Sequence, residues 1–311
     1  MLKPHVLVTG AHRSGTTWVG RTIAQHPRMV YFQEPFNVSD PNDEFGYRFD
    51  AAFFYVPGTQ QAERVHESFD HLLRSVSHPY KLARRMCQVA GPDIKMPLRF
   101  CKYLALGAIQ PKRAVIKDPF ALMSAEWLHH RFDFQVACMI RNPLAFAGSL
   151  KKANWPFNFN HLKNQTHLMK AYFPGEAQKI QQFCEEPGDI IDQACFLWNM
   201  IHSVIIRYRE IYPHWLFLRH EDVARNPLES FKEIFDHLGL RMTRKIREVI
   251  VQDTSDSNPI ETDSPAYTPR NARGSLETWR TRLTAGEIER VVHHTRDISR
   301  SFYRLQGNEF V

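Results

Sequence analysis

A strand, a glycine-bearing turn and a helix follow one another directly at the start of the chain. Residues 5–10 (HVLVTG) form a short apolar run with β-branched side chains that closes on a glycine, which is typical of a buried strand. Residues 16–26 have the apolar spacing of a helix, and Pro27 ends it. This succession brings backbone N–H groups and a helix N-terminus to one anion-sized position. It therefore constrains the chain to an α/β fold with an anion site beside its first strand.

The turn, residues 10–17 (GAHRSGTT), has the outline of the phosphate-binding motif G-x-x-x-x-G-K-[ST] but carries Thr16 at the position of the lysine. In nucleoside triphosphatases and kinases that lysine reaches the γ-phosphate that is transferred or cleaved. Its replacement suggests a nucleotide whose reactive group is not a γ-phosphoryl group. The chemistry must then be sought elsewhere in the chain.

Charge and composition limit the classes of ligand and compartment. The chain has 311 residues, and its 40 Lys and Arg against 33 Asp and Glu give a net charge of +7, which favours anionic ligands such as nucleotides. The five cysteines have no C-x-x-C spacing and the 16 histidines no H-E-x-x-H, so we expect neither a disulfide framework nor a metal site. We find no signal-peptide h-region and no apolar run of 18 residues, so we expect a soluble, cytoplasmic protein.

Polar residues follow three further runs that are typical of buried strands. Glu34 follows residues 29–32, Lys117 and Asp118 end the strand of residues 114–118, and Arg141 follows residues 134–140. The carboxyl ends of parallel strands form the edge at which open α/β sheets bind ligands. These side chains are therefore candidates for one common site.

Helices alternate with these strands along the rest of the chain. Asn142 and Pro143 suit the start of a helix that runs to about residue 153, and Thr284 with Glu287 forms a capping box that opens the last helix. Further helices are expected over residues 189–212 and 226–237, and a strand over 214–218. The alternation predicts a three-layer α/β/α fold, with a parallel sheet covered on both faces.

Three stretches depart from this alternation. Residues 37–110 and 154–187 are rich in aromatic and polar residues, which suits insertions that shape an acceptor pocket or, equally, a satellite core beneath a long excursion. Residues 253–272 are poor in apolar side chains and are expected to form a flexible loop over the cofactor.

With these elements in place, the chain resembles the sulfotransferases that use 3′-phosphoadenosine 5′-phosphosulfate (PAPS). Their first signature, [KR]-[ST]-G-T-[ST]-W, stands here as residues 13–18 (RSGTTW), and their arginine with a serine eight positions later as Arg141 and Ser149. Their late R-x-G or RG element before a tryptophan is matched in part by Arg273, Gly274 and Trp279. Residues 218–223 (LRHEDV) are similar to the family's R-Y-E-D-L stretch, with His220 in place of tyrosine.

These markers extend from about residue 5 to about residue 285. The resemblance implies one sulfotransferase domain over residues 1–311, with a P-loop-like nucleotide-binding fold around a parallel sheet of about five strands. It also implies PAPS as the cofactor, adenosine 3′,5′-bisphosphate (PAP) as its product, and no metal.

The resemblance also implies roles for the residues that match its signatures. Arg13 would neutralise the departing phosphate, while the N–H groups and hydroxyls of the turn would hold the 5′-phosphate. Trp18 ends the first signature and is counted with the cofactor-binding residues, although its place on the apolar face of a helix favours core packing over stacking on adenine, as it does for Trp198. The 5′-phosphate set is Ser14, Gly15, Thr16 and Thr17, and the 3′-phosphate set is Arg141, Ser149 and Arg273, with Gly274 allowing close approach of the backbone.

A base must take the proton of the acceptor hydroxyl, and two carboxylates compete for this role. Glu34 is the first choice, because residues 32–35 (FQEP) resemble the F-x-E-P element of carbohydrate sulfotransferases, in which this glutamate is the base. Asp118 is the rival, because it ends the strand that delivers a lysine and then a histidine in cytosolic sulfotransferases. Lys117 matches that lysine and would bind the sulfuryl oxygens. Each carboxylate could instead have a structural role, as a helix N-cap or as an ion-pair partner of Lys117 or Arg13.

Two other functions remain to be compared with a PAPS-dependent sulfotransferase. A nucleotide-dependent kinase with a degenerate phosphate loop is opposed by Thr16 and by the pairing of Arg141 with Ser149. A non-catalytic binder of nucleotide or nucleic acid is suggested by the net charge of +7, but no nucleic-acid recognition motif accompanies it. We therefore expect an acceptor with a hydroxyl, from a glycan, a lipid or a small metabolite, and the F-x-E-P element favours carbohydrate.

Overall fold

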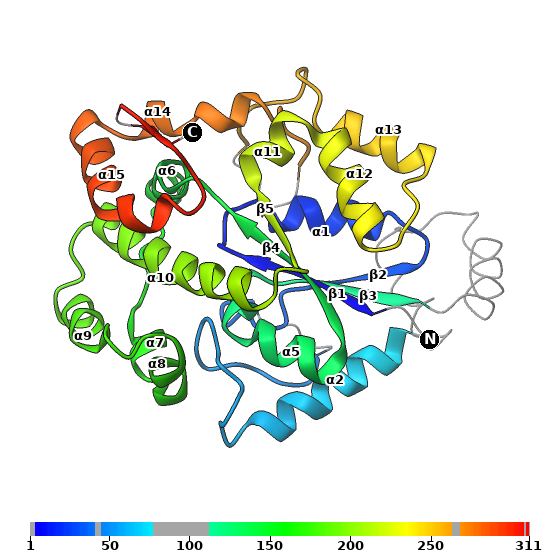
Figure 1. Ribbon diagram of the computed structural model, residues 1–311, viewed down its shortest axis with the longest axis horizontal. Coiled ribbons are helices and arrows are strands. Elements are labelled where there is room, and N and C mark those ends of the chain that lie inside the picture. Colours follow the sequence, from blue (N-terminus) through cyan, green and yellow to red (C-terminus); the bar gives the residue numbers. More distant parts are fainter. Residues whose placement is uncertain (1–3, 41–44, 77–111, 263–267, 308, 311) are drawn as a thin grey trace.

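Five parallel strands form the central sheet, in the order β2-β3-β1-β4-β5 (Figure 1). The computed structural model describes residues 4–40, 45–76, 112–262, 268–307 and 309–310. The predicted parallel sheet is confirmed, and its strands differ from the predicted ranges by at most two residues at either end. They are β1 (His5–Gly10), β2 (Met29–Gln33), β3 (Arg113–Lys117), β4 (Phe134–Ile140) and β5 (Leu216–Arg219).

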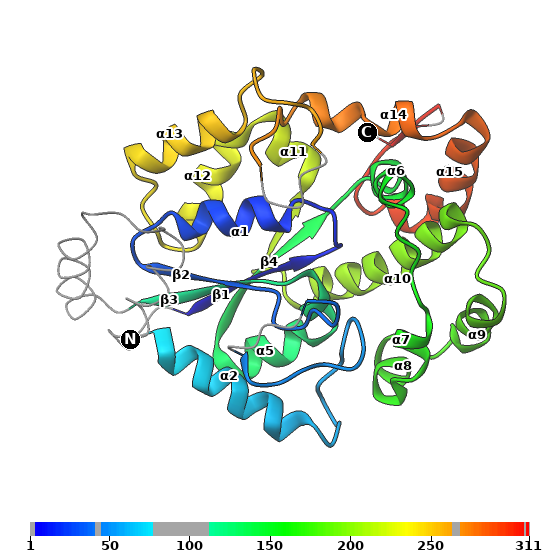
Figure 2. The same cartoon turned by 180° about the vertical axis from the view of Figure 1, so that it is seen from behind.

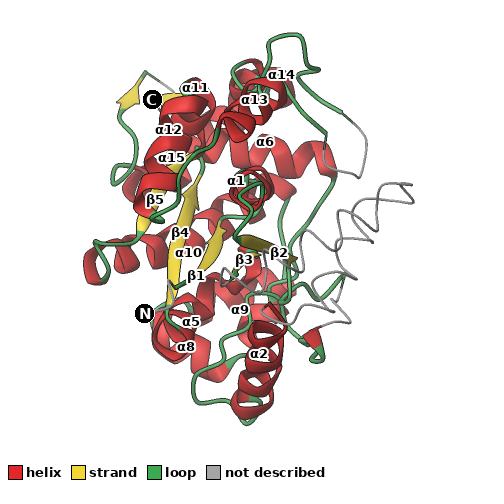
Figure 3. Ribbon diagram, turned by 90° about the vertical axis from the view of Figure 1, so that its right-hand side faces the viewer, coloured by secondary structure: helices red, strands yellow, loops and turns green. Residues whose placement is uncertain are grey.

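Helices cover both faces of the sheet, as the three-layer prediction requires (Figures 1 and 2). Val6 and Val8 of β1 lie in a core with α1 (Thr16–Ala24), α12 (Pro227–His237) and α13 (Arg244–Asp253). Leu7 points to the opposite face, because successive side chains of a strand alternate, and joins the core of α2 (Ala62–Val76), α5 (Ala125–Phe132) and α10 (Ile190–Ile211). Figure 3 shows these layers from the side.

The remaining elements lie mainly at the ends of the sheet and in the insertions. At the end where β4 stops, α6 (Pro143–Ala153) and α15 (Ala285–Ser299) lie beside α10, and α14 (Trp279–Arg282) lies beside α6 (Figure 1). The short elements are η2 (Pro119–Ser124), α7 (Asn160–Lys163), α8 (Thr166–Tyr172), α9 (Ala177–Glu185), α11 (His220–Arg225), η3 (Gly274–Glu277), β6 (Leu305–Gln306) and β7 (Glu309–Phe310).

Local capping signals in the sequence correspond to real helix starts. The side chain of Asn142 accepts a hydrogen bond from the backbone N–H of Leu144, with Pro143 as the first residue of α6. Thr284 and Glu287 form the predicted capping box of α15. These caps satisfy N–H groups that the helix itself leaves without partners, so they fix where α6 leaves the edge of the sheet.

The aromatic residues of the first insertion pack into the core. Phe45, Phe49 and Phe53 are at most 5% exposed, and Phe36 stacks on Phe49 with ring centroids 4.2 Å apart. The described part of this insertion therefore supports the satellite core; the rest, residues 41–44 and 77–110, lies outside the described residues. The second insertion contains α7, α8 and α9, which the sequence did not indicate. In residues 254–262 and 268–272 the expected loop contains no helix or strand.

Gly10 allows β1 to end in close contact with β4. Its φ angle is +123°, and a Cβ atom there would lie 2.2 Å from the carbonyl oxygen of Met139. Both the backbone angle and the lack of space exclude any other residue.

We therefore expect Gly10→Ala to lower the free energy of unfolding by more than about 3 kcal/mol, through backbone strain and overpacking. Gly286→Ala is the matched control, because, apart from its chain neighbours and the backbone of its own helix, no described heavy atom lies within 4 Å of the added methyl group. In α15 this change should raise stability by about 0.4–1 kcal/mol. Urea denaturation of both variants measures the difference, and equal stabilities would contradict the assigned constraint at Gly10.

Candidate active site

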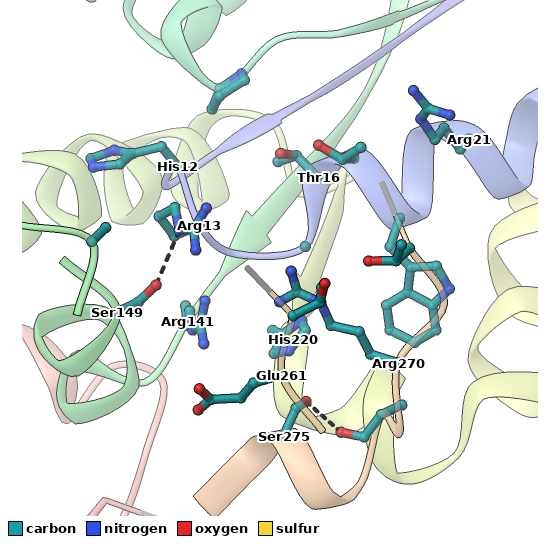
Figure 4. A pocket seen from close by; sticks show the side chains of 18 of the residues that line it. His12, Arg13, Thr16, Arg21, Arg141, Ser149, His220, Glu261, Arg270 and Ser275 are labelled. Carbon is teal, nitrogen blue, oxygen red and sulfur yellow. Dashed lines mark hydrogen bonds between the residues drawn. The ribbon is translucent and has the colours of Figure 1, made fainter. Parts of the chain in front are cut away.

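A cavity of about 820 Å³ lies at the carboxyl edge of the sheet (Figure 4). All five strands deliver residues to it at or just beyond their ends. The turn after β1 provides Arg13, and the ends of β2 and β3 provide Glu34 and Lys117. Arg141 follows β4, and His220 follows β5. The structure thus brings Glu34, Lys117 and Arg141 together as expected, whereas Asp118, which was expected with them, does not line the cavity.

The turn after β1 places the N-terminus of α1 at the cavity. Arg13 and Gly15 have φ angles of +61° and +85°, and a Cβ atom on Gly15 would lie 2.6 Å from Nδ1 of His220. Thr16 and Thr17 line the cavity at the start of the helix. The hydroxyl of Ser14 points into the turn instead, where it donates to the carbonyl of Ala11.

A long-range hydrogen bond joins the first two signature segments. Nε of Arg13 donates to the hydroxyl of Ser149 in α6, at 3.0 Å, across 136 positions of sequence. Arg141, at the end of β4, lines the same cavity, and its Nε is buried with no hydrogen-bond partner in the described part of the chain. A buried guanidinium without a partner is costly, so this atom indicates a place for an anion.

Cationic side chains dominate the described lining of the cavity. Seven basic residues face three acidic ones there. Enclosure in protein lowers the pKa of Arg13, and the charges of Arg270 and Arg282 lower it further. Burial lowers the pKa of Arg141 to about 10; Glu221 opposes this shift, and Arg13 and Arg282 add to it. The four guanidinium groups of this arginine cluster (Arg13, Arg141, Arg270 and Arg282) thus carry mutual repulsion that a bound polyanion would relieve.

The third signature segment contributes different residues from those expected. Arg273 and Gly274 do not line the cavity. Arg273 is exposed and its Nε donates to the carbonyl oxygen of Arg225 at the end of α11, 3.0 Å away. Arg270 and Arg282, which flank it in sequence, line the cavity instead. Several arginines stand close together in this segment, and only the turns into η3 and α14 decide which of them face inward.

Glu34 is held in the cavity by two neighbours. Its backbone N–H donates to the carbonyl of Lys117 at 2.8 Å, which ties the ends of β2 and β3 together. One carboxylate oxygen forms an ion pair with Nζ of Lys117, and the other accepts from Nδ2 of Asn37 at 2.6 Å. The side chain of Lys117 is 2% exposed and that of Glu34 is 19% exposed, so the carboxylate is oriented and still accessible.

Asp118 has a structural environment. Its two carboxylate oxygens accept from the backbone N–H groups of Phe36, at 2.6 Å, and Phe120, at 2.9 Å. The residue is fully buried, caps η2 and does not line the cavity. Burial raises the pKa of Asp118 to about 7, and the nearby Glu34 carboxylate adds to the shift. The N-cap role left open by the sequence is thus the one that the geometry shows.

Several residues that the sequence left unassigned also line the cavity. His12 lies against the rings of Phe146 and Trp155, with centroids 5.0 and 5.3 Å away, and burial lowers its pKa to about 3. Burial likewise lowers the pKa of His220 to about 3, so both imidazoles are neutral near pH 7. Trp155 is 42% exposed at the cavity wall. His12 and His220 fall within the motif-like segments 10–17 and 218–223, but the sequence assigned no role to either residue or to Trp155.

The tryptophans weighed as adenine contacts have different surroundings. Trp198 is fully buried, and its Nε1 donates to the carbonyl of Arg141 at 2.9 Å, so its predicted core role is confirmed. Trp18 lines the cavity while its ring packs edge-on to Phe231. Core packing thus accounts for Trp198 and for one side of Trp18.

A parallel sheet with a phosphate-loop-like turn after its first strand, and a cationic cavity at its carboxyl edge, defines a P-loop-like α/β protein that is suited to anionic ligands. A model described as "Sulfotransferase family" matches residues 4–244 of the chain. The chain belongs to this family, and its activity is sulfuryl transfer.

Individual relatives are distant and cover most of the chain. Carbohydrate sulfotransferase 1 of Homo sapiens is 20% identical over 337 residues, which cover 91% of this chain and 74% of that protein. Carbohydrate sulfotransferase 3 of Rattus norvegicus is 23% identical over 291 residues, covering 87% of this chain and 53% of that protein. The sulfotransferase domain from the curacin biosynthetic pathway is 13% identical, with a TM-score of 0.51 over 98% of this chain and 99% of that one. This last similarity supports the fold.

The described residues offer neither a metal-binding cluster nor a membrane-spanning helix. No three His, Cys, Asp or Glu side chains among residues 4–40, 45–76, 112–262, 268–307 and 309–310 are grouped so that they could hold a metal ion. Within the same ranges, no helix combines the length and apolar character needed to cross a bilayer.

The raised pKa of Asp118 predicts a pH-dependent stability. From its ordinary value of 3.8, the pKa rises to about 7 in the fold, so between these values the folded state binds more protons than the unfolded state and stability falls as pH rises. The variant Asp118→Asn lacks this pH-dependent contribution to the free energy of unfolding. Relative to that variant, the wild type should therefore lose unfolding free energy from about pH 4 to about pH 7.

Urea denaturation across this pH range measures the trend. Asp297→Asn, a change at an exposed carboxylate in α15, is the control and should show no comparable trend. A wild type that gains stability relative to Asp118→Asn over the same range would show instead that its two N–H donors hold the carboxylate ionised.

Proposed function

We propose that the chain transfers the sulfuryl group of PAPS to the hydroxyl of a carbohydrate acceptor by in-line displacement. The observation that carries this proposal is the buried Nε of Arg141, which has no hydrogen-bond partner among the described residues and lies within the arginine cluster of the cavity that the turn before α1 also lines. A nucleotide with phosphate groups at both its 3′ and 5′ positions suits such a cluster better than a single phosphate chain does. Family membership and the fold agree with this donor.

Each part of the donor has candidate partners. The N-terminus of α1, with the hydroxyls of Thr16 and Thr17, would bind the 5′-phosphate. Arg13, fixed by Ser149, would neutralise the charge on the leaving group. Arg141, with Arg270 and Arg282, would bind the 3′-phosphate, and Arg282 would take the role predicted for Arg273. Bound PAPS would supply the activated sulfuryl group.

Glu34 is the proposed base. It is the one of the two candidate carboxylates that lines the cavity, whereas Asp118 is occupied by two backbone N–H groups. Lys117 and Asn37 orient its carboxylate toward one preferred position, which lowers the entropic cost of proton transfer. The ammonium of Lys117 would also neutralise charge that develops on the sulfuryl oxygens.

The proposed carbohydrate acceptor is supported by other observations than those for the donor and the base. The relatives named carbohydrate sulfotransferases and the F-x-E-P element both favour a sugar hydroxyl. The exposed ring of Trp155 beside His12 gives the cavity an aromatic wall, on which the apolar face of a sugar or of a lipid could pack. The kinase alternative finds no support at Thr16, where its lysine would be needed.

Calorimetric titration with PAP and with ATP tests whether the nucleotide donor is PAPS or ATP. We expect PAP to bind more tightly than ATP with Mg²⁺, because the arginine cluster offers partners to a phosphate at the 3′ position. Arg141→Met should weaken PAP binding about 10- to 100-fold, the loss expected for a charge-assisted hydrogen bond. Arg244→Met, an exposed arginine on α13, should leave the affinity unchanged. Tighter binding of ATP would refute PAPS as the donor.

The role of Glu34 has its own test. Glu34→Gln should reduce the transfer of labelled sulfuryl groups to carbohydrate acceptors about 10²- to 10⁴-fold, since it removes the base. PAP affinity should stay within about threefold of the wild type, because Gln preserves the shape of the side chain. PAP titration together with the melting temperature checks that the variant is folded. An active Glu34→Gln alongside a folded, inactive Asp118→Asn would assign the base to Asp118.

A further inference from the structure

One carboxylate forms ion pairs with two cationic side chains of the cavity, in which a phosphate group is expected to bind. Glu261, on the chain between α13 and η3, forms an ion pair with Nζ of Lys152 in α6. Its other oxygen accepts from the guanidinium of Arg282 in α14 at 2.5 Å. All three residues line the cavity, and Figure 4 shows Glu261 in the same space as Arg141 and Arg270.

Arg282 belongs to this ion pair and to the arginine cluster at the same time. Its charge contributes to the lowered pKa of both Arg13 and Arg141. Its Nε is buried with no hydrogen-bond partner in the described part of the chain, so Glu261 satisfies only part of the guanidinium. The hydrogen bond from Lys152 is the main cause of a lowered pKa at Glu261, and burial opposes it. The carboxylate therefore acts as an internal ligand of these cations.

A carboxylate and a phosphate make the same demands on a guanidinium. Both accept paired N–H donors in the plane of the group, and a phosphate dianion adds charge and a further oxygen. Two anions cannot share Lys152 and Arg282 at ion-pair distance without strong repulsion. A phosphate that binds there must displace Glu261.

We propose that Lys152 and Arg282 form an anion site for a phosphate group of the donor nucleotide, and that Glu261 is an internal competitor for it. The identity of the nucleotide rests on the proposed function, whereas the competition requires only a phosphate ligand. Glu261 holds the two cations in place in the free protein and at the same time lowers the affinity for the nucleotide. The exchange of one anion for another keeps these cations paired in both states.

The variant E261Q tests the competition with PAP as the probe. Gln keeps the shape of the side chain and removes its charge, so PAP should bind about 5- to 20-fold more tightly, which corresponds to about 1–2 kcal/mol. E277Q is the matched control, because Glu277 pairs with Arg280 and does not line the cavity. Its PAP affinity should equal that of the wild type. Unchanged or weaker binding to E261Q would overturn the proposal.

A double-mutant cycle distinguishes direct exchange from a general effect of removing negative charge. In an Arg282→Gln background the competition for that guanidinium is absent, so E261Q should tighten PAP binding by clearly less than in the wild type. An equal gain in both backgrounds would overturn the exchange at Arg282. Melting temperatures of all four proteins establish that each is folded.

Inorganic pyrophosphate separates this proposal from the choice of nucleotide. If ATP binds better than PAP, the proposed donor fails, yet E261Q should still bind pyrophosphate more tightly than the wild type and E277Q do. If E261Q leaves pyrophosphate and PAP binding unchanged while PAP is preferred over ATP, the donor stands and the competition fails.

Discussion

The close approach of β1 to β4 at Gly10 is the constraint on which the site depends. Gly10 lies against the carbonyl of Met139 with a positive φ angle, and only a glycine can adopt this position. Its conformation lets the chain leave β1 and turn across the edge of the sheet. The neighbouring strand ends are tied to that edge by backbone hydrogen bonds from Asp118 to Val8 and from Glu34 to Lys117. The N-terminus of α1 and the polar side chains that follow the other strands therefore meet in one cavity.

The cavity holds several positively charged side chains close to one another. Burial and mutual repulsion lower the pKa of Arg13 and Arg141, and these groups are held on a sheet whose two faces are covered by helices. A rigid framework of this kind can hold a guanidinium with an unpartnered Nε until an anion binds, whereas a flexible one would relax and pair it. The carboxylate of Glu261 offsets positive charge at Lys152 and Arg282, while the Nε of Arg141 has no hydrogen-bond partner in the described part of the chain.

Local rules predicted the framework well and the insertions poorly. Strands β1 to β5 and the capped starts of α6 and α15 follow from short apolar runs, Asn142 and the capping box, which act within a few residues. Helices α7, α8 and α9 lie in a stretch of mixed composition, where packing against the rest of the chain decides the conformation. The aromatic residues near Phe49 could equally have lined a pocket, and they became core because Phe36 and Phe69 pack against them.

The sequence by itself determined the α/β class, the turn after β1 and the residues that stand at strand ends, among them Glu34, Lys117 and Arg141. Their placement follows from chain order, since parallel strands bring their carboxyl ends to one edge. The tertiary structure alone decided that Asp118 is buried between two N–H donors, and that Arg282 faces the cavity while Arg273 faces solvent. Such choices depend on the direction of single side chains, which is set by contacts between segments that lie far apart in the sequence.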